Sequence, residues 1–299
     1  MSAIEVHGLR KSYGSFEAVG GVSFEVAAGE VFCLLGPNGA GKTTITEILE
    51  GYRSRNAGTV SVLGVDPAGA PRALRERLGI VLQSCGVQLD LTVGELIQMY
   101  GRYHRASRGV DELIEIVELD AKRDTRASEL SGGQRRRLDL ALALVGEPDL
   151  IFLDEPTTGF DPHARRQAWT TIRSLCELGK TIFLTTHFMD EAQTLADRLA
   201  VMRSGEIVAT GTVEEIGGRG ERPALIRFSY TAGIELPDLP GAETTRSGER
   251  VVIATRDPVR SAARLTGWAI EQGVELGGFS VTQPTLEDIY LELTGEADR

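Results

Sequence analysis

Gly36-Pro37-Asn38-Gly39-Ala40-Gly41-Lys42-Thr43 lies between a short apolar run, Val31–Leu35, and a stretch with the pattern of a helix. The apolar run predicts a buried strand, and the glycines predict a tight turn between this strand and the helix. Glycines let backbone N–H groups close around an anion, and the start of the helix adds the positive end of its dipole. This order of strand, glycine-rich turn and helix predicts a phosphate-binding loop in an α/β fold.

The charged and hydroxyl residues of this loop match the chemistry of a nucleoside triphosphate bound with a metal ion. Lys42 supplies a positive charge for the β- and γ-phosphates, and the hydroxyl group of Thr43 is placed to ligate Mg²⁺. We therefore predict ATP and Mg²⁺ as the cofactors. The residues of the loop predicted to bind ATP are Gly36, Pro37, Asn38, Gly39, Ala40, Gly41, Lys42, Thr43 and Thr44.

An acidic pair follows a second predicted strand. Leu150–Leu153 is apolar throughout, as a fully buried parallel strand is, and ends in Asp154 and Glu155. In a fold with a phosphate loop, an aspartate at the carboxyl end of such a strand reaches the Mg²⁺ shell, so Asp154 is a predicted metal ligand. Glu155 is the predicted general base, because its carboxylate can orient and polarise the attacking water.

A histidine ends the next predicted strand. Thr181–Thr186 is followed by His187, and ligands of open α/β sheets gather at the carboxyl ends of the strands. A single histidine is more often structural than catalytic, but this position favours a contact with the γ-phosphate and the attacking water. We therefore predict His187 as a second catalytic residue.

A second predicted anion site is Leu130-Ser131-Gly132-Gly133-Gln134, at the start of a predicted helix. Ser131 suits the N-cap, and the two glycines leave N–H groups bare at the positive end of the helix. Ser131 lies 89 positions after Lys42, and one nucleotide hardly needs both anion sites of a single chain. A two-fold dimer provides the economical solution, because each ATP then lies between the phosphate loop of one chain and Ser131, Gly132, Gly133 and Gln134 of the other.

These motifs together resemble those of the ATP-binding subunits of ATP-binding cassette (ABC) transporters, over roughly residues 3–218. The resemblance implies a P-loop NTPase fold with a RecA-like core, an antiparallel N-terminal β subdomain and a helical signature subdomain at about residues 84–145. It also implies that Tyr13 stacks on adenine, that Gln83 contacts Mg²⁺ and that Asp161 contacts the second subunit. Phe160 stands where the family more often has leucine, which affects only the packing of the contact between Asp161 and the second subunit.

Within the family, the chain resembles drug and antibiotic exporters of the daunorubicin-resistance type, through Leu91–Glu95, Thr157–Pro162 and Pro284–Tyr290. The resemblance implies an ATPase that forms a homodimer on ATP binding and drives export of a drug, antibiotic, lipid or similar hydrophobic compound. It also implies a cytoplasmic protein, peripheral on the inner face of the cell membrane. An importer subunit shares the same ATPase chemistry and stays an alternative, because the membrane partner decides the direction of transport.

A separate membrane subunit is the predicted partner. No run approaches the roughly 18 to 20 apolar residues of a membrane helix, so another chain must span the membrane. In the family, the segment after Gln83 begins the subdomain that receives the membrane subunit, and we expect Ser84–Tyr103 to contribute to the docking groove. Thr92 and Glu95 form a predicted capping box at the start of a helix in this segment.

The residues beyond the predicted nucleotide-binding domain, residues 1–218, predict a small accessory domain, residues 219–299, after a flexible joint at Gly217–Gly220. Its pattern of strands and helices suggests an α+β domain of the ferredoxin-like kind. The predicted elements are strands at Ala224–Tyr230, Arg250–Thr255 and Gly278–Thr282, a helix at Val259–Gln272 and a closing amphipathic helix from Leu286 to Leu293. We favour a stabilising role that helps dimerisation over a ligand-sensing role, because no convergent polar site is visible in this part of the sequence.

Composition disfavours the rival classes of cassette ATPase. The formal net charge of −11 argues against a nucleic-acid surface, which needs clustered cations, and Arg135-Arg136-Arg137 is interpreted as a solvated helix face. The chain has one cassette, whereas translation factors of the family have two, and it lacks the long heptad stretches of chromosomal ATPases. The three cysteines lie far apart, which favours a reducing compartment and no cysteine metal site.

Overall fold

The computed structural model describes residues 2–69, 71–81, 90–216, 222–230, 235–283 and 286–294. The chain divides into two compact units, Met1–Thr212 and Val213–Arg299, and each is described by itself. The stretch 217–220, in which the sequence predicts the joint between domains, lies outside the described residues. Within the described part of the chain, no helix has both the length and the apolar character needed to cross a membrane.

The first unit contains a six-stranded sheet of mainly parallel strands, with order β5-β6-β7-β3-β8-β9. All neighbours pair in parallel except β8 and β9, which are antiparallel. The strands are β3 (Val31–Leu35), β5 (Leu78–Val81), β6 (Leu150–Asp154), β7 (Thr181–Thr186), β8 (Arg198–Arg203) and β9 (Glu206–Gly211). Every residue of β3, β6 and β7 is buried, which confirms the three strands predicted from apolar runs.

The register of the central strands brings their carboxyl ends to one edge of the sheet. Leu35 at the end of β3 pairs with Thr186 of β7, and Asp154 at the end of β6 pairs with Thr185. Because parallel strands end at the same edge, the residues that follow them along the chain gather there. The phosphate loop, the acidic pair and His187 are therefore neighbours in space.

An antiparallel sheet packs beside the parallel one in the same unit, with order β2-β1-β4. Its strands are β1 (Ser2–Tyr13), β2 (Phe16–Ala27) and β4 (Ala57–Val62). One hydrophobic core joins the two sheets, and Phe24 of β2 stacks on Phe32 and Phe183 with ring centroids 5.4 and 6.0 Å apart. This is the antiparallel N-terminal subdomain that the sequence resemblance implies.

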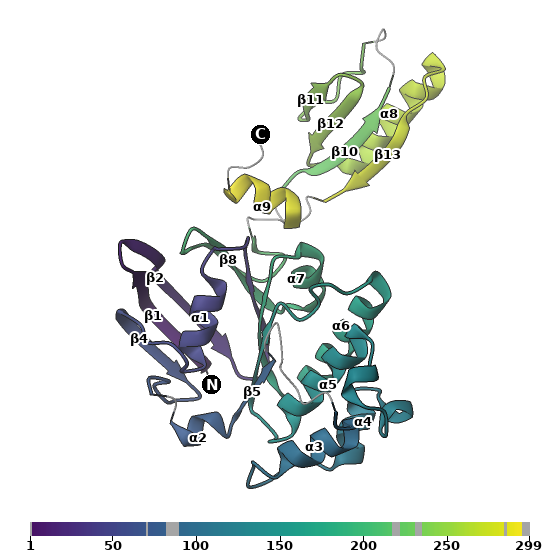
Figure 1. Ribbon diagram of the computed structural model, residues 1–299. Helices are drawn as coiled ribbons and strands as arrows, with labels where there is room; N and C mark the ends of the chain where they lie inside the picture. Colours follow the sequence, from purple (N-terminus) through teal and green to yellow (C-terminus); the bar gives the residue numbers. More distant parts are fainter. Residues whose placement is uncertain are drawn as a thin grey trace. The chain divides into compact units, whose positions relative to one another are not determined.

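The first unit also contains helices and short 3₁₀ turns between its strands (Figure 1). They are α1 (Lys42–Leu49), α2 (Arg72–Arg75), α3 (Val93–Gly101), α4 (Val110–Ile116), α5 (Gly132–Leu144), α6 (Pro162–Glu177) and α7 (Met189–Leu195), with 3₁₀ turns η1 (Asp120–Lys122) and η2 (Ala127–Glu129). Helices α3, α4 and α5 contact one another and form the helical region of the unit. The predicted capping box is present, since Thr92 accepts from the N–H group of Glu95 and the Glu95 carboxylate accepts from that of Thr92.

The second unit is an antiparallel sheet with order β11-β12-β10-β13 and a helix that crosses from β12 to β13. Its elements are β10 (Ala224–Ser229), β11 (Glu243–Ser247), β12 (Arg250–Thr255), α8 (Pro258–Gln272), β13 (Gly277–Thr282) and α9 (Leu286–Thr294). Ile226, Phe228 and Ile253 lie in its core, and Arg227 of β10 bonds Asp288 of α9 at 3.0 Å. The α+β composition agrees with the sequence, but described residues 235–242, between β10 and β11, form no helix.

Candidate active site

The phosphate loop depends on glycine at three places for two different reasons. A Cβ at Gly36 would lie 2.7 Å from the carbonyl oxygen of Met202, and one at Gly41 would lie 2.5 Å from that of Ala18. Gly39 and Gly41 have φ angles of 81° and 103°, in the left-handed region that favours glycine. The loop can therefore pack against its neighbours and make its tight turn only with these residues.

Lys42 is buried under the loop at the start of α1. Its side chain is 5% exposed, and its ammonium group donates to the carbonyl oxygens of Gly36 at 2.7 Å and Pro37 at 3.1 Å. The same Nζ lies 3.7 Å from Oε1 of Glu155. Burial lowers the pKa of Lys42 below its usual value, while the carboxylates of Glu155 and Asp154 oppose this shift.

A pocket of about 400 Å³ opens over the loop. It extends from two exposed aromatic side chains, Tyr13 and Phe16, to the acidic residues at the end of β6. The lining residues are Tyr13, Phe16, Ala18, Asn38, Gly39, Gly41, Lys42, Thr43, Thr44, Asp154 and Glu155. Tyr13 and Phe16 are paired across the turn between β1 and β2, so both rings come from one hairpin.

The two acidic residues at the end of β6 are held by the neighbouring strand β7. Thr185 donates its hydroxyl to Oδ1 of Asp154, and the N–H group of Glu155 donates to the carbonyl oxygen of Thr185 at 3.0 Å. Glu155 has a φ of 45°, in a region that costs a non-glycine residue about 1 to 3 kcal/mol. The chain therefore holds Glu155 in a strained conformation at the point where the strand ends.

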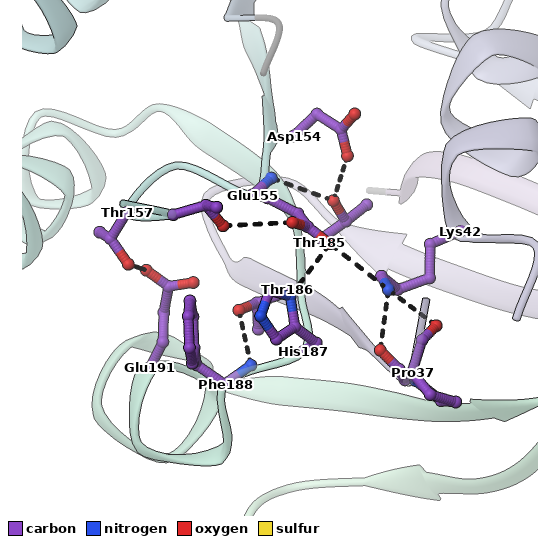
Figure 2. Close-up of polar contacts among 12 residues, drawn as sticks. Pro37, Lys42, Asp154, Glu155, Thr157, Thr185, Thr186, His187, Phe188 and Glu191 are labelled. Atoms are coloured by element: carbon purple, nitrogen blue, oxygen red, sulfur yellow. Dashed lines mark hydrogen bonds and ion pairs between the residues drawn. The ribbon is translucent and has the colours of Figure 1, made fainter. Parts of the chain in front are cut away.

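Among the residues that the structure describes, the Glu155 carboxylate contacts three polar side chains, one of which is Lys42 (Figure 2). Its Oε1 lies 3.1 Å from Nδ1 of His187, and its Oε2 accepts from the hydroxyl group of Thr158 at 3.1 Å. Burial raises the pKa of Glu155, but the hydrogen bond and charge of His187 and the charge of Lys42 outweigh burial and leave the pKa below its usual value. Glu155 is therefore an anion at neutral pH, as a general base must be.

The signature segment, Ser131–Gln134, lines a separate pocket of about 710 Å³. Ser131 caps α5 by accepting from the N–H group of Gln134, and the Gln134 side chain accepts from the N–H group of Ser131. Asp161 caps α6 in the same pocket by accepting from the N–H groups of His163 and Ala164. Two helix N-termini thus point into one pocket, which makes it suited to an anion.

The three arginines after the signature segment are not a solvated face, so that interpretation is wrong. Arg136 and Arg137 have side chains that are 12% and 17% exposed. Each of the three guanidinium groups reaches a backbone carbonyl oxygen, because the long apolar stem of arginine can lie along the core. The contacts are Arg135 to Ala127 at 3.3 Å, Arg136 to Asp154 at 3.0 Å and Arg137 to Glu118 at 3.3 Å.

The structure brings together most, but not all, of the site residues expected from the sequence. Lys42, Glu155 and His187 are in direct contact, and Tyr13, Thr43 and Asp154 line the same pocket as Lys42. The signature segment and Asp161 line the second pocket, which shares only Glu155 with the first among the described lining residues. Gln83 and the first part of the expected docking groove, residues 84–89, lie outside the described residues.

Sequence reasoning missed three contacts of the site. Thr158 and Thr185 hold the two carboxylates, and Phe16 lies beside Tyr13 in the loop pocket. Thr185 has a sequence signal, since it ends an apolar run one strand from Asp154. Thr158 and Phe16 have none without the turn geometry that places them.

Comparisons with known proteins agree with this geometry. A family model described as "ABC transporter" matches residues 19–158, and one described as "ABC transporter domain-containing protein-like, C-terminal domain" matches residues 224–285. The chain is 40% identical to the Nod factor export ATP-binding protein I of Rhizobium johnstonii, over 98% of this chain and 95% of that protein. It is 42% identical to the protein of the same name from Rhizobium meliloti, over 98% and 88%.

Solved structures of ATP-binding cassettes are also similar. The ADP conformation of an ATP-binding cassette of an ABC transporter has a TM-score of 0.65 and 27% identity, and covers 72% of this chain and 92% of that one. A protein from Clostridium perfringens, described as part of the ABC transporter complex cbiONQ, has a TM-score of 0.65 and 28% identity, over 74% and 92%. Both matches support a P-loop ATPase fold for the larger part of the chain.

Proposed function

Because this chain belongs to the ATP-binding subunits of ABC transporters, we propose that it hydrolyses ATP in a two-fold dimer and thereby drives export through a separate membrane subunit. The chain is an ATPase of that family, and the assignments below concern the roles of its own residues. The observation that carries the proposal is the presence of two anion-binding pockets in one unit, which meet at Glu155.

We assign ATP binding to the pocket over the phosphate loop. The loop residues 36–44 surround the phosphates with N–H groups, and Lys42 moves from its carbonyl partners to the β- and γ-phosphates. Tyr13 is 40% exposed at the far side of this pocket, where its ring offers a face for adenine. Phe16 is a second aromatic surface beside it.

The oxygen donors of the pocket fit Mg²⁺. Thr43 and Asp154 both line it, and Mg²⁺ prefers a carboxylate or hydroxyl oxygen together with substrate phosphates and water. Thr185 fixes one carboxylate oxygen of Asp154, so the orientation of that ligand is set in advance. When bound, the ion neutralises charge on the β- and γ-phosphates, and Gln83 is the further ligand expected from the family resemblance.

Hydrolysis depends on Glu155 as the base. Its lowered pKa keeps it ionised, and its carboxylate lies between Lys42 on one side and His187 on the other. A water in line with the γ-phosphate gives its proton to Glu155 while its oxygen forms a bond to the γ-phosphorus, and the bond from that phosphorus to the leaving oxygen of ADP breaks. His187 orients the carboxylate and supports the γ-phosphate.

The second pocket serves the nucleotide of the partner subunit. Ser131 and Gly133 offer a hydroxyl group and a helix N-terminus to the γ-phosphate, and Asp161 contacts the other subunit beside them. An ATP that spans two chains stabilises the dimer, and its hydrolysis lets the dimer reopen. This cycle moves the membrane subunit through the region after Gln83.

The direction of transport is outward in this proposal. The similar proteins from Rhizobium are named for export of Nod factors, and the chain covers nearly the full length of them. We carry over the direction and not the cargo, because the membrane subunit contacts the cargo. The chain then works on the cytoplasmic face of the membrane, with residues 219–299 as an accessory domain that supports dimerisation.

The test is ATP-dependent dimerisation, measured by analytical ultracentrifugation. Glu155→Gln should lose about 10²- to 10⁴-fold in hydrolysis and should form a dimer with ATP. Glu155→Gln combined with Ser131→Arg should bind ATP as a monomer, whereas Glu155→Gln combined with Ser247→Arg, on the exposed strand β11, should still dimerise. A dimer of equal strength in all three proteins would refute the in-trans assignment of Ser131.

A further inference from the structure

Arg136 connects the helix of the signature segment to the strand end that holds Glu155. It lies in α5, five residues after Ser131, and its side chain is 12% exposed. Its Nε donates to the carbonyl oxygen of Pro156 at 3.1 Å, and its Nη2 donates to that of Asp154 at 3.0 Å. One guanidinium group therefore binds the backbone on both sides of Glu155.

This double contact acts on a residue whose backbone is already constrained. The N–H group of Glu155 bonds Thr185 of β7, and its φ of 45° leaves little freedom to turn. The two carbonyl groups that flank Glu155 both accept from Arg136, which belongs to α5. A displacement of α5 along its axis thus pulls directly on the backbone of Glu155.

Arg136 also has a second acceptor within reach. Oδ2 of Asp139, one turn further along α5, lies 4.0 Å from its Nη1. Asp139 is 7% exposed, and none of the described residues bonds its Oδ1. A buried carboxylate without full partners attracts a nearby guanidinium group strongly, so the described residues offer the Arg136 side chain two competing sets of acceptors. Small movements of α5 can shift it between them.

We propose that Arg136 is a positioning residue that couples the signature segment of each subunit to Glu155 of the same subunit. This inference rests on the proposed in-trans dimer. There, the signature segment of a chain clamps the ATP of its partner, whereas Glu155 of that chain hydrolyses its own ATP. Arg136 then links occupancy of one ATP site to the alignment of the base in the other. The two sites hydrolyse ATP cooperatively because of this link.

The neighbouring arginine provides a matched control. Arg137 is 17% exposed and lies on the same helix, but its Nη1 contacts the carbonyl oxygen and carboxylate of Glu118 at 3.3 and 3.4 Å. Loss of Arg137 removes a guanidinium group of similar burial from α5 without a direct effect on the strand end. A difference in activity between the Arg136 and Arg137 variants therefore measures the effect of the contact that Arg136 makes with the backbone of Asp154 and Pro156.

The experiment measures ATPase rate against ATP concentration for Arg136→Gln, Arg136→Lys and Arg137→Gln. Arg136→Gln should bind ATP normally but lose about 10- to 100-fold in kcat, since a small misplacement of a catalytic group has an effect of this size. Its Hill coefficient should fall from above 1 toward 1. Arg136→Lys should recover part of the rate, and Arg137→Gln should resemble the unmodified protein.

Asp139→Asn tests the link without removal of Arg136. The amide at position 139 attracts Arg136 less than the carboxylate does, so Arg136 stays bonded to the carbonyl groups of Asp154 and Pro156. The kcat should stay within about 2-fold of that of the unmodified protein, while the Hill coefficient falls toward 1. This variant decides the question if Arg136→Gln does not fold. Unchanged cooperativity in Asp139→Asn and Arg136→Lys, or equal losses in Arg137→Gln, would overturn the coupling.

ATP-dependent dimerisation separates failure of this inference from failure of the proposed function. Glu155→Gln that stays monomeric with ATP would refute the dimer, and the coupling with it. The coupling alone would be refuted if the Glu155→Gln protein dimerises with ATP and the Arg136 variants keep the cooperativity of the unmodified protein. Glu155→Gln combined with Arg136→Gln should still dimerise, because Arg136 acts on alignment of the base and not on the clamp.

Discussion

The phosphate-loop pocket and the signature pocket both suit an anion, but they achieve this in different ways. The loop pocket is built from close backbone contacts, with Gly36 and Gly41 against neighbouring carbonyl groups and a buried Lys42. The signature pocket is larger, about 710 Å³ against about 400 Å³. Its lining combines two helix N-termini, capped by Ser131 and Asp161, with three arginine side chains that are each already bonded to a backbone carbonyl oxygen. A Cβ at Gly132 there would meet no atom within 4 Å.

This difference indicates which pocket can hold a nucleotide alone. A buried lysine at the start of a helix, next to a glycine-rich loop, binds phosphates without help. Helix N-termini supply partial charges, each worth about 0.3 to 1 kcal/mol, which can add to a bound anion but hold it weakly by themselves. We therefore propose that the loop pocket binds a nucleotide by itself, and that the signature pocket completes a site only in a dimer, where it meets the phosphate of another chain.

The largest expected effect is the contrast between Lys42→Ala and Ser131→Arg. Lys42→Ala should weaken ATP binding by about 10- to 100-fold or more, because charged hydrogen bonds to phosphate are lost. Ser131→Arg should bind ATP normally as a monomer, yet neither variant should hydrolyse it. Fluorescent-nucleotide titration and phosphate release measure the two properties.

A mixture of these two inactive variants sharpens the contrast. Mixed dimers contain one site with an intact loop and an intact signature segment, so a 1:1 mixture should recover up to about a quarter of the normal activity. The Ser131→Arg protein mixed with inactive Ser131→Arg/Lys42→Ala protein is the control and should stay inactive. No recovery in the mixture of Lys42→Ala and Ser131→Arg would mean that one chain forms the whole site.

A smaller effect is expected from one methyl group added to a glycine of the phosphate loop or of the signature segment. Gly36→Ala should lower the free energy of unfolding by about 1 to 3 kcal/mol, because its Cβ would lie 2.7 Å from the Met202 carbonyl oxygen. Gly132→Ala should change it by less than about 0.5 kcal/mol, since the space there is open. Urea denaturation of both variants measures this, and equal losses would contradict the proposed contrast in packing.

An effect of similar size, seen only as a change with pH, concerns two buried carboxyl groups, Glu50 near Asp154 and Asp139 near Arg136. Burial raises the pKa of Glu50 from 4.5 to about 8 and that of Asp139 from 3.8 to about 6. The folded state therefore keeps a proton that the unfolded state releases, and stability falls as pH rises between the two values. For Glu50 this window is about pH 4.5 to 8; for Asp139 it is about pH 3.8 to 6.

Amide variants remove this pH dependence. Glu50→Gln should raise the free energy of unfolding by about 1 to 3 kcal/mol at about pH 8 and leave it unchanged below about pH 4. Asp139→Asn should raise it by about 1 kcal/mol at about pH 6, with no further gain at higher pH. Thermal unfolding across pH, in chelator and without nucleotide, measures both. A gain that is constant across pH would show that the effect is not protonation.

The sequence predicts the parts of the fold that have buried apolar runs or glycine-rich loops. β3, β6 and β7 are such runs, and the phosphate loop is defined by steric needs that only glycine meets. The sequence does not predict β11, because all five of its residues are exposed and none is apolar. It exists through its pairing with β12, which is a tertiary effect that local pattern does not encode.

The site, like the fold, has residues that the sequence predicts and contacts that it does not. Lys42, Asp154 and Glu155 follow from motifs at strand ends, whose position the parallel sheet determines. Charge alone suggests an exposed face for Arg136, whereas its carbonyl partners come from a strand end, with Asp154 lying 18 residues further along the chain. Contacts from a side chain to a distant backbone have no sequence pattern, so only the structure reveals them.

The left-handed conformation of Glu155 has a consequence for how this protein can change over generations. Glycine is the residue that takes a φ of 45° most easily, so conformational preference alone does not select an acid at position 155. Under the role that we propose for Glu155, an acid is kept at this position by its part in hydrolysis. Selection for heat resistance without selection for hydrolysis should therefore lose this residue early, and a lineage that has lost transport should show the loss first at this position.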